Sequence, residues 1–321
     1  MEQIINPIGR HLLRSELSSE KLLRMSSRGN NEIYVVDGES SPAVMKEIGR
    51  LRELAFRNCG GGTGKSVDID DFDLIPGLYR QLIVWSPEEE AILGGYRYSL
   101  GLTTPYRSDG QPLWASSDYF RFSEEFIRTI MPYAIELGRS FVSPEYQSSR
   151  SGARSIFALD NLWDGLMTII VNNPDLRYFF GKMTMYNQYC REARNLILFF
   201  LKMLFPCSST MVEPKYPVSL DSVPDSAEND FRKENFNEAY RVLKREIHNL
   251  GEHLPPLVNS YMKLTDRMQV FGTSHNMDFG NVEETAILID IYDVAESTLM
   301  RHITSAEFME WQAAGNNYRR V

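Results

Sequence analysis

Apolar and polar residues alternate along the chain with two periods, and these periods predict a mixture of helices and strands. Between residues 41 and 58, apolar residues recur at helical spacing after Ser41 and Pro42, which favour the start of a helix. Similar patterns predict helices at 123–131, 156–173, 186–205, 234–251 and 255–264, and a short helix that ends in a loop within 18–32. Runs rich in β-branched and aromatic residues predict strands at 32–38, 79–86, 91–101, 133–142, 177–185, 268–272 and 284–294.

The order of these elements predicts an α/β (α+β) fold in which helices flank one sheet. No internal repeat or low-complexity tract divides the pattern, so we interpret residues 1–321 as one domain. We expect an N-terminal extension at 1–40 and an insertion at about 206–250. The first part of that insertion, 206–230, contains four prolines and little periodicity, which is typical of a long loop beside a cleft.

Composition narrows the classes of protein to consider. The chain carries a net charge of −9, which argues against non-specific binding of nucleic acid. Its 3 cysteines are scattered, which indicates a reducing, cytoplasmic environment and no disulfide framework or zinc site. The most apolar run, 195–205, is shorter than the roughly 20 residues of a membrane span and contains Lys202. It predicts a buried amphipathic helix, with peripheral contact at a membrane as the alternative.

The glycine-rich stretch CGGGTGKS at 59–66 almost matches a phosphate-binding loop, G-x-x-x-x-G-K-[ST]. Cys59 occupies the position of the first glycine. The stretch also follows a predicted helix and leads into an acidic segment, whereas a phosphate loop follows a strand and opens a helix. We therefore interpret it as a mobile connector between the helix and the acidic segment.

Four groups of residues are candidates for chemistry: Arg52 with Phe56 one helical turn later, Asp70 with Asp73, Arg97 in a strand, and Glu136 with Arg139 in the next strand. Each has an ordinary explanation when taken alone, such as a solvated helix face or a cross-strand ion pair. Residues 136 and 139 would point to opposite faces of a regular strand. A one-residue bulge near Gly138 would bring both to one face and free a backbone N–H.

As a set, these motifs resemble a known family. The motifs R-x-x-x-F at 52–56, D-x-x-D at 70–73, Y-R at 96–97, E-L-G-R-S-F-V at 136–142 and LW-DG-L at 162–166 are similar to those of acyl-carrier-protein-dependent acyltransferases of the GNAT superfamily. The nearest resemblance is to bacterial N-acyltransferases of lipid biosynthesis that acylate glycine or ornithine and are often labelled hemolysins. Acyl-homoserine-lactone synthases are more distant relatives with the same pattern.

The resemblance implies a mostly antiparallel sheet in which strands 133–142 and 177–185 splay apart to admit a phosphopantetheine arm. It also implies a donor-binding segment, made of Ser140, Phe141, Val142, Gln147, Arg150, Gly152 and Arg154. In the superfamily, a glycine-containing loop after the central strand binds the diphosphate of coenzyme A. Here Arg150 stands where that loop has its first glycine, which favours acyl carrier protein over free coenzyme A as the donor and partner.

The reaction expected from the resemblance is aminolysis of a fatty thioester by an amino acid, without a tightly bound cofactor or a metal. Glu136 would accept the proton, directly or through water, or would instead form an ion pair with Arg139 or Arg97 that holds the site. Asp70 and Asp73 would bind the ammonium group, and Arg52, Arg97 or Arg139 the carboxylate.

Further roles fall on the strand around Ser140 and on the tyrosines that follow the later strand. Backbone N–H groups near Ser140 and Phe141 would stabilise the oxyanion. Tyr186 or Tyr189 would protonate the leaving thiolate. Two alternatives remain at this point: an acetyl-coenzyme A-dependent acetyltransferase acting on a small amine, and a non-enzymatic protein associated with membranes.

Overall fold

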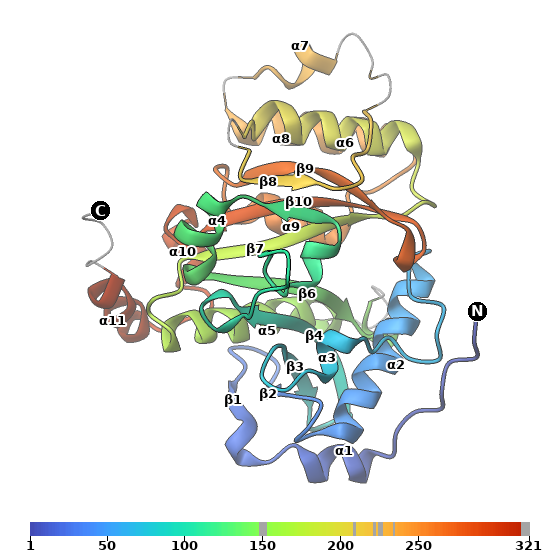
Figure 1. Ribbon diagram of the computed structural model, residues 1–321, viewed down its shortest axis with the longest axis vertical. Coiled ribbons are helices and arrows are strands. Elements are labelled where there is room, and N and C mark those ends of the chain that lie inside the picture. The colour runs from blue at the N-terminus through green and yellow to red at the C-terminus, as the bar shows by residue number, and fades with distance from the viewer. Residues whose placement is uncertain (148–152, 208–209, 221–222, 224–226, 234, 316–321) are drawn as a thin grey trace.

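Figure 1 shows the computed structural model, which describes residues 1–147, 153–207, 210–220, 223, 227–233 and 235–315. Its main sheet has eight strands in the order β1-β2-β3-β4-β6-β7-β10-β9. Their bounds are Leu22–Met25 (β1), Glu32–Val36 (β2), Arg80–Ser86 (β3), Ala91–Leu100 (β4), Ala134–Val142 (β6), Tyr178–Met185 (β7), Val282–Asp290 (β10) and Gln269–Asn276 (β9). A two-stranded sheet pairs β5 (Phe120–Phe122) with β8 (Val212–Pro214).

Every pair of neighbours in the main sheet is antiparallel except β6 and β7, which run parallel. These two strands pair only where Ala134–Glu136 meets Tyr178–Phe180. Beyond Glu136 and Phe180 they continue to Val142 and Met185 without pairing with each other. The predicted mostly antiparallel sheet with one splayed pair of strands is therefore confirmed.

Helices cover both faces of the sheet. Leu82 and Ile83 are neighbours in β3 and point to opposite faces. Leu82 packs in one core cluster with Leu166 of α5 (Ala153–Asn172), and Ile83 packs in another with Ile48 of α2 (Pro42–Asn58). The other helices are α1 (Arg10–Glu16), α3 (Asp71–Leu74), α4 (Glu124–Thr129), α6 (Arg191–Leu204), α7 (Ala227–Phe231), α8 (Phe236–Asn249), α9 (Pro256–Leu264), α10 (Glu296–Leu299) and α11 (Ser305–Gly315).

The far end of the sheet carries a helical layer of its own. Figure 1 shows α6 and α8 beside each other above β9 and β8. Leu196, Ile197 and Phe200 of α6 are buried in the core while Lys202 is exposed, so the predicted buried amphipathic helix at 195–205 is confirmed. Within the described residues, no helix is both long and apolar enough to cross a membrane.

Two expectations about individual elements were wrong. Residues 18–32 do not form a helix, because Leu22–Met25 pairs with β2 as the edge strand β1, so sheet pairing overrides a weak helical pattern. Within 206–230, Val212–Pro214 forms β8 and Ala227–Phe231 forms α7, so that segment is not a loop throughout. Strands β1 and β2 lie inside the main sheet. The division into one domain with an extension and an insertion stays a prediction.

Candidate active site

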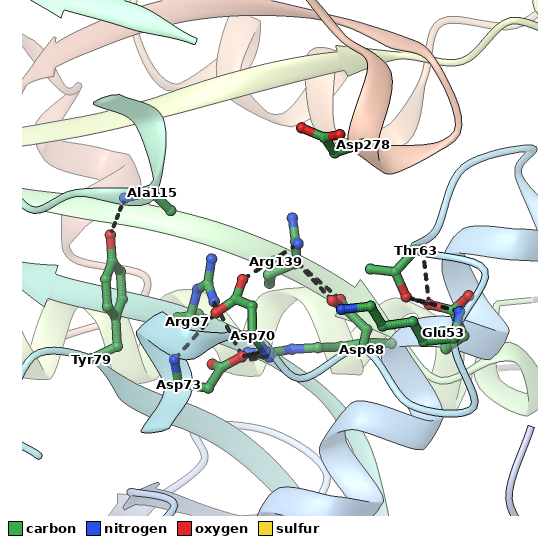
Figure 2. A network of polar contacts seen from close by, with 12 residues as sticks. Glu53, Thr63, Asp68, Asp70, Asp73, Tyr79, Arg97, Ala115, Arg139 and Asp278 are labelled. Atoms are coloured by element: carbon green, nitrogen blue, oxygen red, sulfur yellow. Dashed lines mark hydrogen bonds and ion pairs between the residues drawn. The ribbon is translucent and has the colours of Figure 1, made fainter. Parts of the chain in front are cut away.

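Three arginines and three aspartates form one buried network where α2, α3, β4 and β6 meet (Figure 2). We call it the Arg–Asp network: Arg52, Arg97, Arg139, Asp68, Asp70 and Asp73. Arg52 of α2 is fully buried and places Nη1 3.2 Å from Oδ1 of Asp73. It also donates a short hydrogen bond to the side-chain oxygen of Gln81, whose amide donates to Asp73 at 2.9 Å.

Arg97 of β4 joins the two aspartates at the start of α3. Its Nη1 lies 2.6 Å from Oδ1 of Asp70 and 3.1 Å from Oδ2 of Asp73. Its guanidinium carbon lies 4.8 Å from the centre of the Tyr79 ring. Three formal positive charges therefore face three formal negative charges, and the burial of each is compensated within the network.

The start of α3 and its packing on α2 position the three aspartates in the Arg–Asp network. Asp70 caps α3, and its side chain accepts from the backbone N–H of Asp73 while the Asp73 side chain accepts from that of Asp70. The preceding residues pack directly on α2, where the backbone N–H of Asp68 donates to Gly49 at 2.9 Å. A Cβ at Gly49 would lie 2.6 Å from Ile69, so only glycine allows this close approach.

Burial and charge move the pKa values in opposite directions within the network. Although burial alone would raise the pKa of Asp73, the guanidinium groups of Arg97 and Arg52 hold it well below its ordinary value. Burial raises the pKa of Asp68, and Arg139 and Arg52 only partly offset that effect. Burial alone would lower the pKa of Arg97, but the carboxylates of Asp73 and Asp70 raise it above its ordinary value. Asp73 is therefore held as a carboxylate more firmly than Asp68.

The predicted bulge is present in β6, one position later than Gly138. Gly95 pairs with Phe141 and Arg97 with Gly138, so Tyr96 of β4 stands opposite both Arg139 and Ser140. Arg139 has a φ of +49°, in the left-handed region. This conformation directs its side chain to Asp68, with Nε 2.9 Å from Oδ2, and over the Phe279 ring at 4.3 Å. Phe56 packs edge-on against the same ring at 5.0 Å and thus supports Arg139 from below.

Glu136 is buried on the same strand but outside the Arg–Asp network. Its carboxylate accepts a short hydrogen bond from the Tyr79 hydroxyl and one of 3.0 Å from the backbone N–H of Ser116. Tyr79 in turn accepts from the N–H of Ala115 at 2.8 Å (Figure 2). The expected ion pair with Arg139 or Arg97 is not formed, because both arginines are engaged by aspartates. Glu136 instead fixes the 3₁₀ turn Ala115–Asp118.

The two candidate proton-donating tyrosines follow β7. Burial raises the pKa of Tyr186, and Cys59 and Glu284 raise it further, so its hydroxyl stays protonated at neutral pH. Its ring packs over Gly61, at which a Cβ would come within 2.6 Å of it. Tyr189 points elsewhere and donates to the carbonyl of His253 at 2.9 Å. Of the two, only Tyr186 is electrostatically coupled to Arg139.

The predicted donor-binding residues are described in part. Phe141 is buried against α2, and Ser140 is half-buried near the hydroxyl of Tyr96. Gln147 donates to the Val142 carbonyl at 2.6 Å and so closes the turn after β6. Arg150 and Gly152 lie outside the described residues. Arg154 lies in α5, and its side chain is not among those described.

The loop 59–66 binds a carboxylate of the protein itself. The side chain of Glu53 in α2 accepts from the N–H groups of Thr63 and Gly64 at 3.0 and 2.8 Å and from the Thr63 hydroxyl (Figure 2). Gly60, Gly62 and Gly64 have positive φ, which this tight path requires. The N–H groups that a phosphate loop would offer to a nucleotide are thus occupied. These contacts favour a fixed support for α2 over the mobile connector that we expected.

A second charged pair, not predicted from the sequence, lies on the other side of the split between β6 and β7. Nζ of Lys182 in β7 lies 2.7 Å from Oε2 of Glu284 in β10, and both side chains are largely buried. A lysine inside the apolar strand 177–185 and a glutamate at the start of 284–294 were the available signals. Their pairing depends on the register of β7 with β10. Among the described residues, no cluster of His, Cys, Asp or Glu is suited to hold a metal ion.

Comparisons with known proteins agree with this architecture. Residues 51–155 match the family model of the acetyltransferase (GNAT) domain. A glycine N(alpha)-acyltransferase of Phocaeicola vulgatus is 50% identical over 305 residues, which cover 95% of this chain and 94% of the relative. A glycine N(alpha)-acyltransferase of Bacteroides thetaiotaomicron is 50% identical over 303 residues, which cover 94% of this chain and 90% of the relative.

Two solved structures also match. An N-acyl amino acid synthase from uncultured soil microbes aligns with a TM-score of 0.38 and 9% identity, over 87% of this chain and 99% of that chain. A CoA-dependent acyl-homoserine lactone synthase aligns with a TM-score of 0.36 and 10% identity, over 89% of this chain and 90% of that chain.

Proposed function

This chain is an acyltransferase of the family that contains the glycine N(alpha)-acyltransferases, and we propose that it transfers a fatty acyl group from acyl carrier protein to the amine of glycine. The product is an N-acyl amino acid. The observation that carries the proposal is the parting of β6 and β7 directly beside Arg139. A phosphopantetheine arm that enters there places its thioester next to the bulge of β6. The names of the two relatives support glycine over ornithine as the acceptor.

The bulge supplies the electrostatic part of the proposed mechanism. In a bulge the extra residue is left unpaired, and Ser140 is one of the two residues that stand opposite Tyr96. We propose that backbone N–H groups around Ser140 and Phe141 bind the thioester oxygen. The amine attacks the carbonyl carbon, and the tetrahedral intermediate collapses with cleavage of the C–S bond. Tyr186, which burial keeps protonated, donates its proton to the thiolate.

The Arg–Asp network shapes the acceptor side. Arg52 and Asp73 are sealed inside it, and we assign them a supporting role. Asp70 and Arg139 are its more exposed members, with side chains 28% and 17% exposed, and we propose that they border the acceptor. Phe56 acts through Phe279 and Arg139.

We assign Glu136 a positioning role, because both its carboxylate oxygens already accept hydrogen bonds that hold the turn at 115–118. Glu136→Gln should therefore lower kcat without changing the shape of the pH–rate profile. If Glu136 accepts the substrate proton, the variant should depend on free amine, and its rate should rise about tenfold per pH unit below the pKa of that amine. The second outcome would restore the role expected from the sequence.

The donor and the acceptor are tested by comparing product formation from each combination of the two. Purified protein is incubated with palmitoyl-acyl carrier protein or palmitoyl-coenzyme A, together with glycine or ornithine, and products are quantified by mass spectrometry. We expect N-palmitoylglycine, formed faster from the carrier-protein thioester. A preference for coenzyme A would overturn the donor, and a preference for ornithine the acceptor.

Because the product is a lipid, we further propose that the protein contacts membranes peripherally. Co-sedimentation with anionic liposomes measures this contact. Protein that remains entirely in the supernatant would contradict it.

A further inference from the structure

Gly138 lies on β6 just beyond the point where β6 and β7 part. Phe180 is the last residue of β7 that pairs with β6, opposite Glu136. Two residues further along each strand, on the same face, lie Lys182 and Gly138. Gly138 pairs with Arg97 of β4, so this face is the one that carries the Arg–Asp network. A Cβ placed on Gly138 would meet no atom within 4 Å. There is therefore room directly in front of Gly138, on the face of the sheet where β6 and β7 have parted.

Lys182 and Glu284 lie across the split from Gly138, on β7 and on its neighbour β10. Nζ of Lys182 lies 2.7 Å from Oε2 of Glu284. The contact is an ion pair by distance but lacks hydrogen-bond geometry, and Oε2 has no hydrogen-bond partner within the described part of the chain. Glu284 is only 3% exposed. A buried carboxylate oxygen without a directed donor is costly, and this one is placed to accept a bond from a ligand.

Other charged and titratable groups lie close to Lys182 and Glu284. The ring of Tyr119 lies 5.1 Å from Nζ of Lys182, and its hydroxyl donates to Asp278 at 3.3 Å. Figure 2 shows Asp278 above Arg139, with no contact drawn between them. After burial, Glu284 raises the pKa of Tyr119, whereas Arg139 lowers it. Glu284 likewise raises the pKa of Tyr186, and Arg139 lowers it. Arg139 and Glu284 thus act on common neighbours from opposite sides of the split.

We propose that this space binds the acceptor amino acid as a zwitterion, with Lys182 on its carboxylate and Glu284 on its ammonium group. The inference rests on the proposed function and names its acceptor site. The carboxylates of the Arg–Asp network are already engaged by guanidinium groups, whereas Lys182 and Glu284 form a single ion pair with each other, among the residues that the structure describes. A bound zwitterion brings one opposite charge to each of them. Glycine, which has no side chain, fits beside the bare backbone of Gly138.

The chemistry balances within this arrangement. Glu284 accepts one proton from the ammonium group, and the neutral amine attacks the thioester carbon. When the C–S bond breaks, the thiolate takes a proton from Tyr186, and the new amide nitrogen loses its second proton. That proton returns to the tyrosine, while the proton on Glu284 leaves to solvent. One thioester and one ammonium yield one amide, one thiol and one released proton.

The role of Lys182 is tested by acceptors that differ in charge. Glycine and glycinamide share the amine, but glycinamide lacks the carboxylate. In the wild-type protein, kcat/KM for glycine should exceed that for glycinamide at least tenfold. In Lys182→Met/Glu284→Gln, which removes the pair together so that no buried charge is left alone, this ratio should fall close to one. The matched control is Arg232→Met/Glu228→Gln, an exposed ion pair in which the ratio should not change.

Gly138→Val tests the space itself. The added side chain has room, so the unfolding midpoint should stay within the error of the wild type, while KM for glycine rises at least tenfold and KM for the acyl donor does not. An unchanged KM for glycine in both variants would overturn the inference, even when the wild type makes N-acylglycine.

A direct binding measurement separates this inference from the proposed function. Titration of 13C-labelled glycine followed by NMR needs no acyl transfer. Saturable binding that is lost in Lys182→Met/Glu284→Gln supports the site, whatever the donor proves to be. Equal binding in both proteins, or none in the wild type at any concentration up to the KM for glycine, contradicts it.

Discussion

Two charged groups face each other across the split between β6 and β7, and they are built differently. In the Arg–Asp network each of the three aspartates contacts at least one arginine, and Asp70 and Asp73 contact two. Lys182 and Glu284 form one ion pair that lacks hydrogen-bond geometry. A network in which partners are shared resists rearrangement, because moving one group leaves others buried without compensation. A single pair can exchange its partner for a ligand. The first group therefore suits support, and the second suits binding.

The largest expected effect is a loss of folding stability when the Arg–Asp network is broken. Arg97→Met should lower the free energy of unfolding by about 3–5 kcal/mol, because it leaves Asp73 and Asp70 short of a buried partner. Urea unfolding followed by tryptophan fluorescence measures the loss. Arg232→Met, in an exposed pair, should cost no more than about 1 kcal/mol. Similar losses in both variants would show that the network is not specially dependent on its pairing.

A smaller difference should separate two aspartates of the same network. Asp73→Asn should cost about 1.5–3 kcal/mol at pH 7, because it removes a charged acceptor from Arg52 and Arg97. Asp68→Asn should cost less, because the raised pKa of Asp68 means that its ionised form is the less favoured one in the folded state.

The difference between these variants should depend on pH. The pKa of Asp73 is lowered from 3.8 in the folded state, so its stabilising effect is present above that value and is lost as the pH falls through the folded pKa. The pKa of Asp68 is raised, so ionisation of Asp68 lowers the free energy of unfolding at neutral pH, and this loss disappears as the pH falls. In unfolding curves recorded from pH 7 to pH 2, the gap between the two variants should therefore narrow as the pH falls below 3.8, and it should close only as the pH approaches the folded pKa of Asp73. A gap that stays constant would contradict the assignment.

The smallest effect on stability should come from the other side of the split. Lys182→Met/Glu284→Gln should change the free energy of unfolding by no more than about 1 kcal/mol, because replacing a whole buried pair is often close to neutral. Urea unfolding checks this directly. A loss as large as that of Arg97→Met would mean that both groups serve the fold.

The Arg–Asp network was largely predictable from the sequence, and the pair of Lys182 and Glu284 was not. Arg52, Asp73 and Arg97 belong to motifs whose resemblance to N-acyltransferases named the family, which the 50% identical relatives confirm. A single glycine also predicted the bulge, although the left-handed residue is Arg139. The contacts of Glu136 with Tyr79 and Ser116 could not be predicted, because they depend on how the turn at 115–118 folds back over β6.

Lys182 and Glu284 lie about 100 residues apart, and only the pairing of β7 with β10 brings them together. Strand pairing over such a separation is not encoded in local periodicity. The edge strand β1 was missed for a similar reason, because its partner β2 decides its conformation. Local patterns thus located most elements, whereas contacts between distant strands determined the chemistry of the split.

Acceptor binding by Lys182 and Glu284 is tested most directly by the KM for glycine of Lys182→Met/Glu284→Gln, measured with saturating acyl donor on protein whose unfolding midpoint is known. We expect a KM at least tenfold higher than that of the wild type and an unfolding midpoint close to it. A KM equal to that of the wild type would contradict the assignment of acceptor binding to this pair.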